Sequence, residues 1–256
     1  MKLPRLLQLI VGLASLFPLC LPARSQFLRV AISDTIPIDK LETMNEALQI
    51  ADPAPRLDLL KRLGVDANVA EAATSARFSH DIEIQPLRTH SGKLYGIVSL
   101  PCGLQVQTFL YLLDNSGANT WHVVDHIALD CFHQTPTYQL LSLAPGEDSI
   151  FVHHAHSGHG AGEIREIEDK AALYTIRNGR MHEVLSTLDY ISRQEASDSS
   201  PPVEQKSSFL QLSSRVIEET RITSKNDSPI RAERRVWRWS MKQEVFSATP
   251  FHVVPE

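Results

Sequence analysis

The chain has 256 residues, of which 43% are hydrophobic, and a formal net charge of −5. This length can bury one substantial core, or one core with a small appendage. The acidic balance argues against nucleic acid and against an anionic membrane surface as partners, because both require a basic footprint. No stretch of the sequence after residue 25 is long and apolar enough to suggest a membrane span.

Residues 1–25 have the pattern of a secretory signal peptide. A short basic start precedes an almost continuously apolar run over residues 6–17, and the small residues Ala23 and Ser25 stand where a cleavage site requires them. The apolar run, at about a dozen residues, is too short to span a bilayer. We therefore expect an exported protein, periplasmic or secreted, whose mature chain begins at Gln26. Cleavage would remove three basic residues and leave 22 against 30 acidic ones, a net charge of −8.

Residues 26–76 are predicted to form a helical N-terminal appendage. Apolar residues follow helical spacing over 39–51, and an Asp-Pro step at 52–53 both stops that helix and starts the next. Gly64 is placed to cap the second helix, and a third short helical turn is expected over 68–76. Leucines at this spacing more often build a core than an interface. We therefore expect packing over one end of a sheet, with a partner-docking module as the alternative.

The rest of the chain, residues 77–256, has the period-two alternation of an antiparallel β domain. Asn178-Gly179 is the strongest hairpin signal, because this dipeptide suits a two-residue turn. Residues 192–208 are rich in serine and poor in apolar residues, so we expect a mobile loop there. Residues 234–239 alternate in type, and the outward arginines of this stretch are most simply the solvated face of a strand.

The predicted fold class is all-β: mainly an antiparallel β-meander, arranged as a sandwich or open barrel, with a small helical N-terminal appendage. A weak internal echo about 60 residues apart also suggests a partial propeller, although a propeller requires more regular repeats.

A long hairpin is predicted from residues 104–114 and 120–130. If Ser116-Gly117 forms a two-residue turn, the numbers of opposed residues sum to 233, and Leu112 faces Trp121. One face of this hairpin is almost wholly apolar, which supports the register because a one-residue slip would expose that face.

The same register places Cys102 opposite Cys131. Opposed residues on paired strands have β-carbons about 4.5–5.5 Å apart, close to what a disulfide needs. Cys20 leaves with the signal peptide, so an even number of cysteines enters an oxidising compartment. The sequence therefore predicts a Cys102–Cys131 disulfide. Thr108 and Asp125 face each other as the one polar pair on the apolar face.

Four of the eleven histidines lie within residues 153–159. On a strand, His154 and His156 would point to one face, His159 could return from the following loop, and Glu163 could complete a metal site. Zinc or copper would be the metal, since imidazole nitrogen suits both. No established ligand spacing is present, and the alternative is a polar strand face that runs into a glycine-rich loop.

Catalytic motifs are not found in the sequence. The Gly-x-Ser-x-Gly pattern does not occur, and the glycine-rich stretch at 158–162 lacks the strand–loop–helix context of a phosphate-binding loop. We expect an exported, non-catalytic β-rich protein with a binding or structural role, whose partner is an unknown protein or small ligand. The alternative is a metal-binding protein or metal-dependent hydrolase that uses residues 153–159.

Overall fold

The structure is a computed structural model, and its described part belongs to one compact unit, Ile36–Glu256. It describes residues 39–75, 82–89, 91–102, 107–115, 120–131, 136–144, 147–159, 164–195 and 201–255. The predicted signal peptide lies outside these residues.

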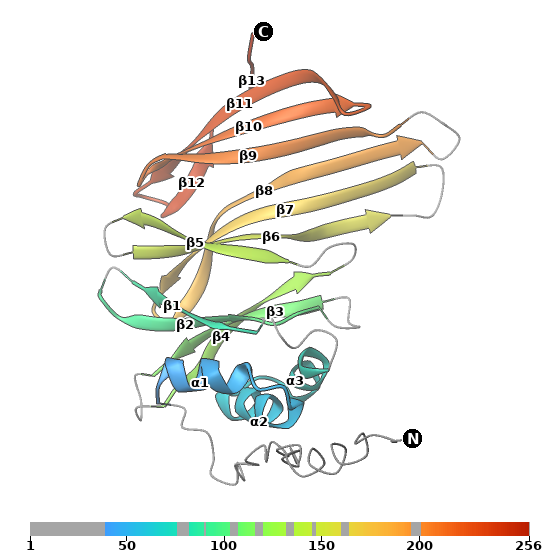
Figure 1. Cartoon of the computed structure of the whole chain (residues 1–256). Coiled ribbons are helices and arrows are strands. Elements are labelled where there is room, and N and C mark those ends of the chain that lie inside the picture. The colour runs from blue at the N-terminus through green and yellow to red at the C-terminus, as the bar shows by residue number, and fades with distance from the viewer. Residues whose placement is uncertain are drawn as a thin grey trace, which may run out of the picture. The chain divides into compact units, whose positions relative to one another are not determined.

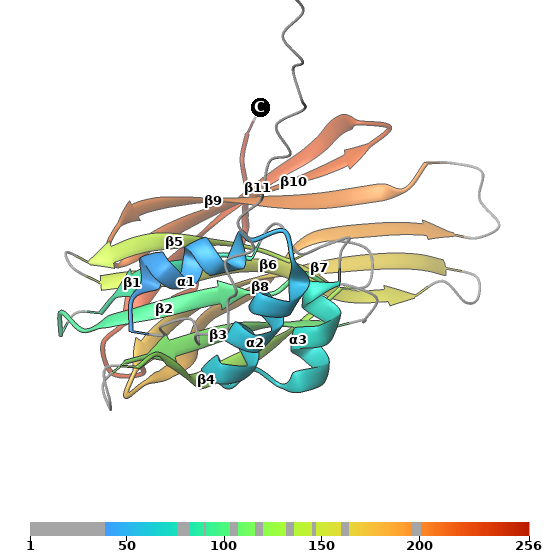
Figure 2. The ribbon, with the colours of Figure 1, turned by 60° about the horizontal axis from the view of Figure 1, so that its bottom comes forward.

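Three short helices precede the strands: α1 (Leu41–Leu48), α2 (Pro53–Leu63) and α3 (Ala67–Thr74). The Asp52 side chain accepts a hydrogen bond from the Ala54 amide at the start of α2, and Gly64 ends that helix with a φ of 94°. The helices lie against the first strands of the sheet (Figure 2). None of the three is long and apolar enough to cross a membrane.

All described strands belong to one 13-stranded sheet, and the described strands pair antiparallel throughout. Its main path runs β1-β2-β3-β4-β6-β7-β8-β9-β10-β11-β12, with β5 paired to β6 and β13 to β11 (Figure 1). The strands are β1 (Ile84–Arg88), β2 (Leu94–Ser99), β3 (Gln107–Asp114), β4 (His122–Asp130), β5 (Thr137–Ala144), β6 (Glu147–His159), β7 (Ile164–Arg177), β8 (Arg180–Glu195), β9 (Val203–Ser213), β10 (Val216–Lys225), β11 (Ser228–Ser240), β12 (Val245–Ala248) and β13 (His252–Val253). This architecture confirms the predicted class, all-β with a small helical appendage.

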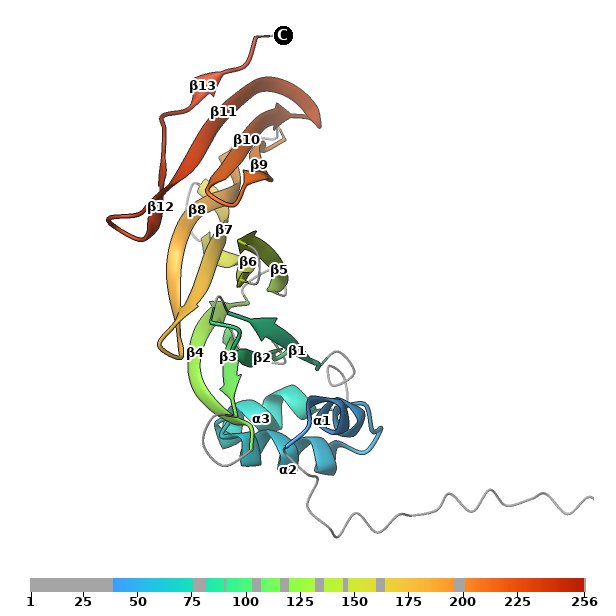
Figure 3. The same cartoon turned by 90° about the vertical axis from the view of Figure 1, so that its left-hand side faces the viewer.

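The sheet buries both of its faces over much of its length. On β2, Val98 packs into a core shared with the helices, whereas its neighbour Ile97 packs into a second core shared with β6–β8. On β6, Val152 belongs to that second core, whereas Phe151 belongs to a third core shared with β10–β12. Period-two alternation thus distributes neighbouring side chains between successive cores. Figure 3 shows the strands of the sheet following one another from the helices toward β13.

The hairpin of β7 and β8 forms as predicted. Arg177 pairs with Arg180, and the turn residues Asn178 and Gly179 have φ values of 51° and 74°. A two-residue turn of this kind requires two positive φ angles, which asparagine and glycine adopt most readily.

The register predicted for the hairpin of β3 and β4 is wrong. Leu112 pairs with Asp125 rather than facing Trp121, so the pairing is displaced by four positions. Trp121 instead lies just before β4, is buried in the helical core and donates from Nε1 to the Asp39 carbonyl at 3.3 Å. The connection between the strands is therefore longer than the two-residue turn that we assumed.

The Cys102–Cys131 disulfide is confirmed, with the two α-carbons 6.0 Å apart. It does not arise from the predicted ladder, however. The last pair of β3 and β4 is Gln107 with Asp130, and both cysteines lie beyond it. The disulfide therefore links the segments that precede β3 and follow β4, at the end of the hairpin opposite its turn.

The polar pair predicted within that hairpin is also wrong. The Thr108 hydroxyl donates to the Leu100 carbonyl at 2.6 Å, whereas Asp125 accepts a hydrogen bond from the Met181 amide at 2.7 Å. Asp125 thereby connects β4 to the start of β8.

The loop predicted over residues 192–208 is wrong for most of that range. β8 continues to Glu195 and β9 begins at Val203, with Arg193 paired to Val203; residues 196–200 lie outside the described part of the chain. Ser207, within this serine-rich stretch, is only 8% exposed and donates a hydrogen bond to the buried carboxylate of Glu219. At this position a serine therefore belongs to a paired strand and bonds inside the protein, rather than to a loop.

Candidate functional site

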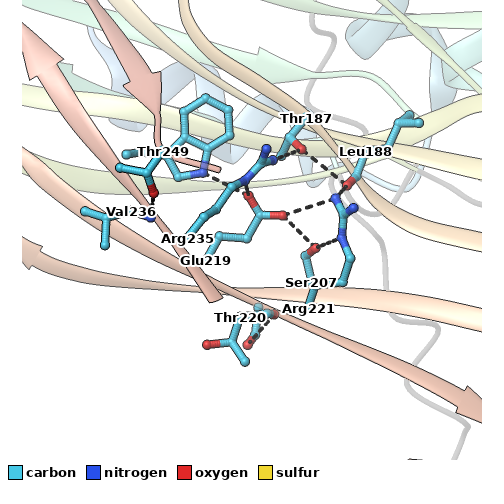
Figure 4. Close-up of polar contacts among 11 residues, drawn as sticks. Thr187, Leu188, Ser207, Glu219, Thr220, Arg221, Arg235, Val236 and Thr249 are labelled. Carbon is cyan, nitrogen blue, oxygen red and sulfur yellow. Dashed lines mark hydrogen bonds and ion pairs between the residues drawn. The ribbon is translucent and has the colours of Figure 1, made fainter. Parts of the chain in front are cut away.

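A fork in the sheet between β8 and β9 positions the candidate site. The two strands pair only over residues 190–193 and 203–206, although both continue well beyond these pairs. Side chains from the next strands bridge the opening. Arg221 on β10 donates to the Leu188 carbonyl at 3.1 Å, and Arg235 on β11 donates to the Thr187 hydroxyl at 2.6 Å (Figure 4).

A buried carboxylate, that of Glu219 on β10, lies at the centre of this fork. Its side chain is 0% exposed and receives hydrogen bonds from four side chains. The donors are Arg235 Nε (2.6 Å) and Trp237 Nε1 (2.8 Å) to Oε2, and Ser207 Oγ (2.8 Å) and Arg221 Nη2 (3.4 Å) to Oε1. We call Thr187, Ser207, Glu219, Arg221, Arg235, Trp237 and Phe251 the Glu219 cluster.

The register of β10 and β11 explains how the cluster assembles. Glu219 pairs with Arg235, and Ile217 pairs with Trp237. Because side chains alternate along a strand, Arg235 shares its face of β11 with Trp237. The outward arginines of this strand, Arg234 and Arg238, are exposed as expected, whereas Arg235 lies on the other face, for which the sequence suggested no role. The signal that would have identified it is its spacing of two residues from a tryptophan.

The cluster carries more positive than negative charge. Arginine stays protonated in proteins, so Arg221 and Arg235 together carry two positive charges against the single carboxylate of Glu219. Glu233 lies opposite Arg221 in the register, but its carboxylate bonds to Arg231 at 2.7 Å. Desolvation lowers the pKa of Arg221, as does the nearby Arg235, whereas the carboxylates of Glu219 and Glu233 raise it.

The accessible part of the cluster is cationic. The side chains of Arg221 and Arg235 are 18% and 16% exposed, whereas Glu219 is inaccessible. Among the described residues, the Nη1 atoms of both arginines make no hydrogen bond. The cluster therefore retains guanidinium donors that an anion could use.

An aromatic ring lies over these two guanidinium groups. The centroid of Phe251 is 4.3 Å from Cζ of Arg221 and 4.2 Å from Cζ of Arg235. Arg235 also contacts the ring of Trp237, at 4.5 Å. Such contacts stabilise a cation without neutralising it, so the surplus charge persists.

A histidine–aspartate pair connects β6 and β8, the two strands that flank β7 in the sheet. His153 Nδ1 is 2.5 Å from Asp189 Oδ2, and its ring packs edge-on against Phe151 at 4.7 Å. The other oxygen of Asp189, Oδ1, is buried without a hydrogen-bond partner among the described groups. Among the residues that the structure describes, no hydroxyl or thiol hydrogen-bonds to His153. The pair therefore has no nucleophile bonded to it there, as a catalytic triad would require.

The predicted metal-site histidines lie on β6 but in different environments. His154 is 7% exposed, and its Nδ1 is 2.8 Å from the Ala155 carbonyl oxygen; burial lowers its pKa. His156 is exposed, because the pairing shifts between Ala155 and Ser157 and leaves His156 as an extra residue on the strand. The two histidines thus differ in burial, and the shared metal site stays a prediction.

The other two predicted ligands, His159 and Glu163, lie partly or wholly outside the described residues. His159 ends β6, but its side chain lies outside the described part of the structure, as does all of Glu163. Among the residues that the structure describes, no group of three or more His, Cys, Asp or Glu side chains could hold a metal ion. Zinc or copper binding stays a prediction of the sequence.

Comparison with known protein families, with curated proteins and with solved structures finds no match to this chain. The geometry of the Glu219 cluster is therefore the basis for assigning a function.

Proposed function

We propose that this is an exported, non-catalytic binding protein that holds an anionic group of its partner against Arg221 and Arg235. The N-terminal sequence pattern and the Cys102–Cys131 disulfide support export to an oxidising compartment, periplasmic or extracellular.

One observation carries the proposal: two partly exposed guanidinium groups share a single, inaccessible carboxylate. An approaching ligand meets positive charge and unused N–H donors. Guanidinium groups bind carboxylate and phosphate oxygens through short, charge-assisted hydrogen bonds. An anion at the Nη1 atoms would balance the surplus charge of the cluster.

The chemistry of the cluster favours binding over catalysis. Arginine stays protonated near neutral pH, so neither guanidinium is suited to general acid–base work. The Glu219 carboxylate already accepts four hydrogen bonds in a buried setting, which leaves it poorly placed to accept a proton from a substrate.

Anion titration tests the proposal. Sodium acetate and sodium phosphate are added at constant ionic strength, and binding is followed through amide NMR shifts of β10 and β11. Arg221→Gln removes one guanidinium but keeps the Glu219–Arg235 ion pair, so the variant should fold. Its affinity for the anions should fall about tenfold, the effect of losing a hydrogen bond of roughly 1.4 kcal/mol to a charged group.

Arg234→Gln is the matched control, because it removes an arginine from the adjacent position of β11, on the opposite face. Its anion affinity should equal that of the wild type. The proposal is overturned if neither anion binds the wild type, or if both variants lose the same affinity.

A further inference from the structure

The segment that carries Phe251 is weakly attached to the sheet. Residues 249–254 follow β12 and continue along the same edge of β11, where β13 contributes only two residue pairs. Further bonds run from the Thr249 amide to the Val236 carbonyl and from the Val254 amide to the Ala232 carbonyl, each 2.9 Å, and from the Val236 amide to the Thr249 hydroxyl, 3.0 Å. Pro250 interrupts the pairing because it has no N–H donor.

Burial changes sharply at the start of this segment. Phe246 in β12 is buried in the third core, whereas none of residues 249–255 is buried and Val253 is 60% exposed. Within the segment, the ring of Phe251 packs against the two guanidinium groups of Arg221 and Arg235. Segments with few buried apolar contacts open at low free-energy cost.

The position of Phe251 suggests which kind of side chain would compete with it for the two guanidinium groups. Its ring lies against the two guanidinium groups, where an anionic side chain would make stronger, hydrogen-bonded contacts. Neighbouring residues of an extended chain alternate in direction, and the flanking Pro250 and His252 are exposed. A peptide in the same place would thus direct one side chain in every two toward the sheet.

We propose that residues 249–254 form a displaceable strap, and that the partner replaces it as an extended acidic peptide. The peptide adds a strand to the edge of β11 and places a carboxylate side chain against Arg221 and Arg235. Strand addition of this kind takes its affinity from backbone hydrogen bonds and its specificity from alternate side chains. This inference rests on the proposed function, since it names the partner of the same cationic pair.

Peptide binding to the full-length protein tests the strap. The probe is a synthetic copy of residues 249–254 in which glutamate replaces the phenylalanine, and a glutamine version is the control. Phe251→Ala removes the ring that holds the strap. Because apparent affinity falls with the fraction of protein that is competent to bind, this variant should bind the glutamate peptide about tenfold more tightly than the wild type. The glutamine peptide should bind more weakly to both proteins.

Equal affinity of wild type and Phe251→Ala for the glutamate peptide would overturn the strap, and so would equal affinity for the two peptides. If acetate and phosphate still bind through Arg221, only this inference fails and the proposed function stands. If neither anion nor peptide binds any form of the protein, both fail.

Hydrogen exchange of the wild-type protein provides a second test that needs no substitution. The Thr249 and Val254 amides should exchange well before the hydrogen-bonded amides of β10 and β11, because the strap opens without global unfolding. Exchange of these two amides only with global unfolding would overturn the proposal.

Discussion

Two carboxylate–arginine pairs join the same two strands, and they differ chiefly in which face they occupy. On one face, Glu219 and Arg235 are 2.6 Å apart, with side chains 0% and 16% exposed. On the other, Glu218 and Arg234 are 3.5 Å apart, with side chains 19% and 51% exposed. The residue types and strands are the same, so the comparison isolates the effect of burial and of additional partners.

The buried pair is part of a network, whereas among the described residues the side chains of the exposed pair make no further hydrogen bond or ion pair. Glu219 also receives hydrogen bonds from Trp237 and Ser207. A charge removed from such a site leaves its former partner desolvated and uncompensated. A charge removed from a solvated pair is replaced by water. Neighbouring positions of one strand should therefore respond very differently to the same substitution.

The largest effect is expected for the central carboxylate. Glu219→Gln leaves two guanidinium groups without a counter-charge and should lower the free energy of unfolding by about 3–5 kcal/mol. Glu218→Gln, the matched change on the opposite face, should lower it by about 0–1 kcal/mol. Urea unfolding followed by circular dichroism measures both. Similar losses in the two variants would show that the buried network does not stabilise the fork.

A smaller effect is expected for the indole donor. Trp237→Phe removes the hydrogen bond to the charged Glu219 carboxylate, which contributes about 1.5–3 kcal/mol to the free energy of unfolding. Trp239→Phe is the control, because Trp239 packs against Phe246 in the same core and its indole makes no hydrogen bond among the described residues. The same urea experiment compares them, and the account requires the larger loss at Trp237.

The histidines of β6 extend the comparison to pH. Burial lowers the pKa of His154 in the folded protein, whereas the unfolded chain keeps the ordinary value near 6.5. The unfolded state therefore binds more protons as the pH falls below about 6.5, and stability contributed by neutral His154 is lost toward the lower, folded pKa. His154→Gln should reduce this acid-side loss of stability, and exposed His156→Gln should not. The midpoints of urea unfolding, measured from pH 7.5 to 5, compare the two variants. An equal acid-side loss of stability in both would contradict the role given to His154.

Local features of the fold were predictable because their causes are local. Asp52 and Gly64 delimit a helix through contacts with their own neighbours, and Asn178-Gly179 sets a turn through its own φ angles. The Cys102–Cys131 bridge was identified correctly from a register that was four positions wrong, because the cysteines lie outside the ladder.

The candidate site was not predictable, because its partners are distant in sequence. Glu219 is satisfied by Ser207 and Arg235, 12 and 16 residues away, and the polar stretch around Ser207 reads as a loop when its partner is unknown. The bulge at His156 appears only in the pairing of β6 with β7, which the histidine pattern does not contain. Both the Glu219 cluster and the bulge at His156 thus depend on pairing between strands rather than on the composition of one segment.

Anomalous diffraction from crystals soaked in sodium bromide tests the central claim most directly. Bromide is a monovalent anion whose position can be located without assumptions about the partner. We expect the strongest site within hydrogen-bond distance of Arg221 and Arg235, and its loss in Arg221→Gln. Bromide found only at the exposed Arg234 and Arg238, with none at the Glu219 cluster, would contradict the assignment of this cluster as an anion-binding site.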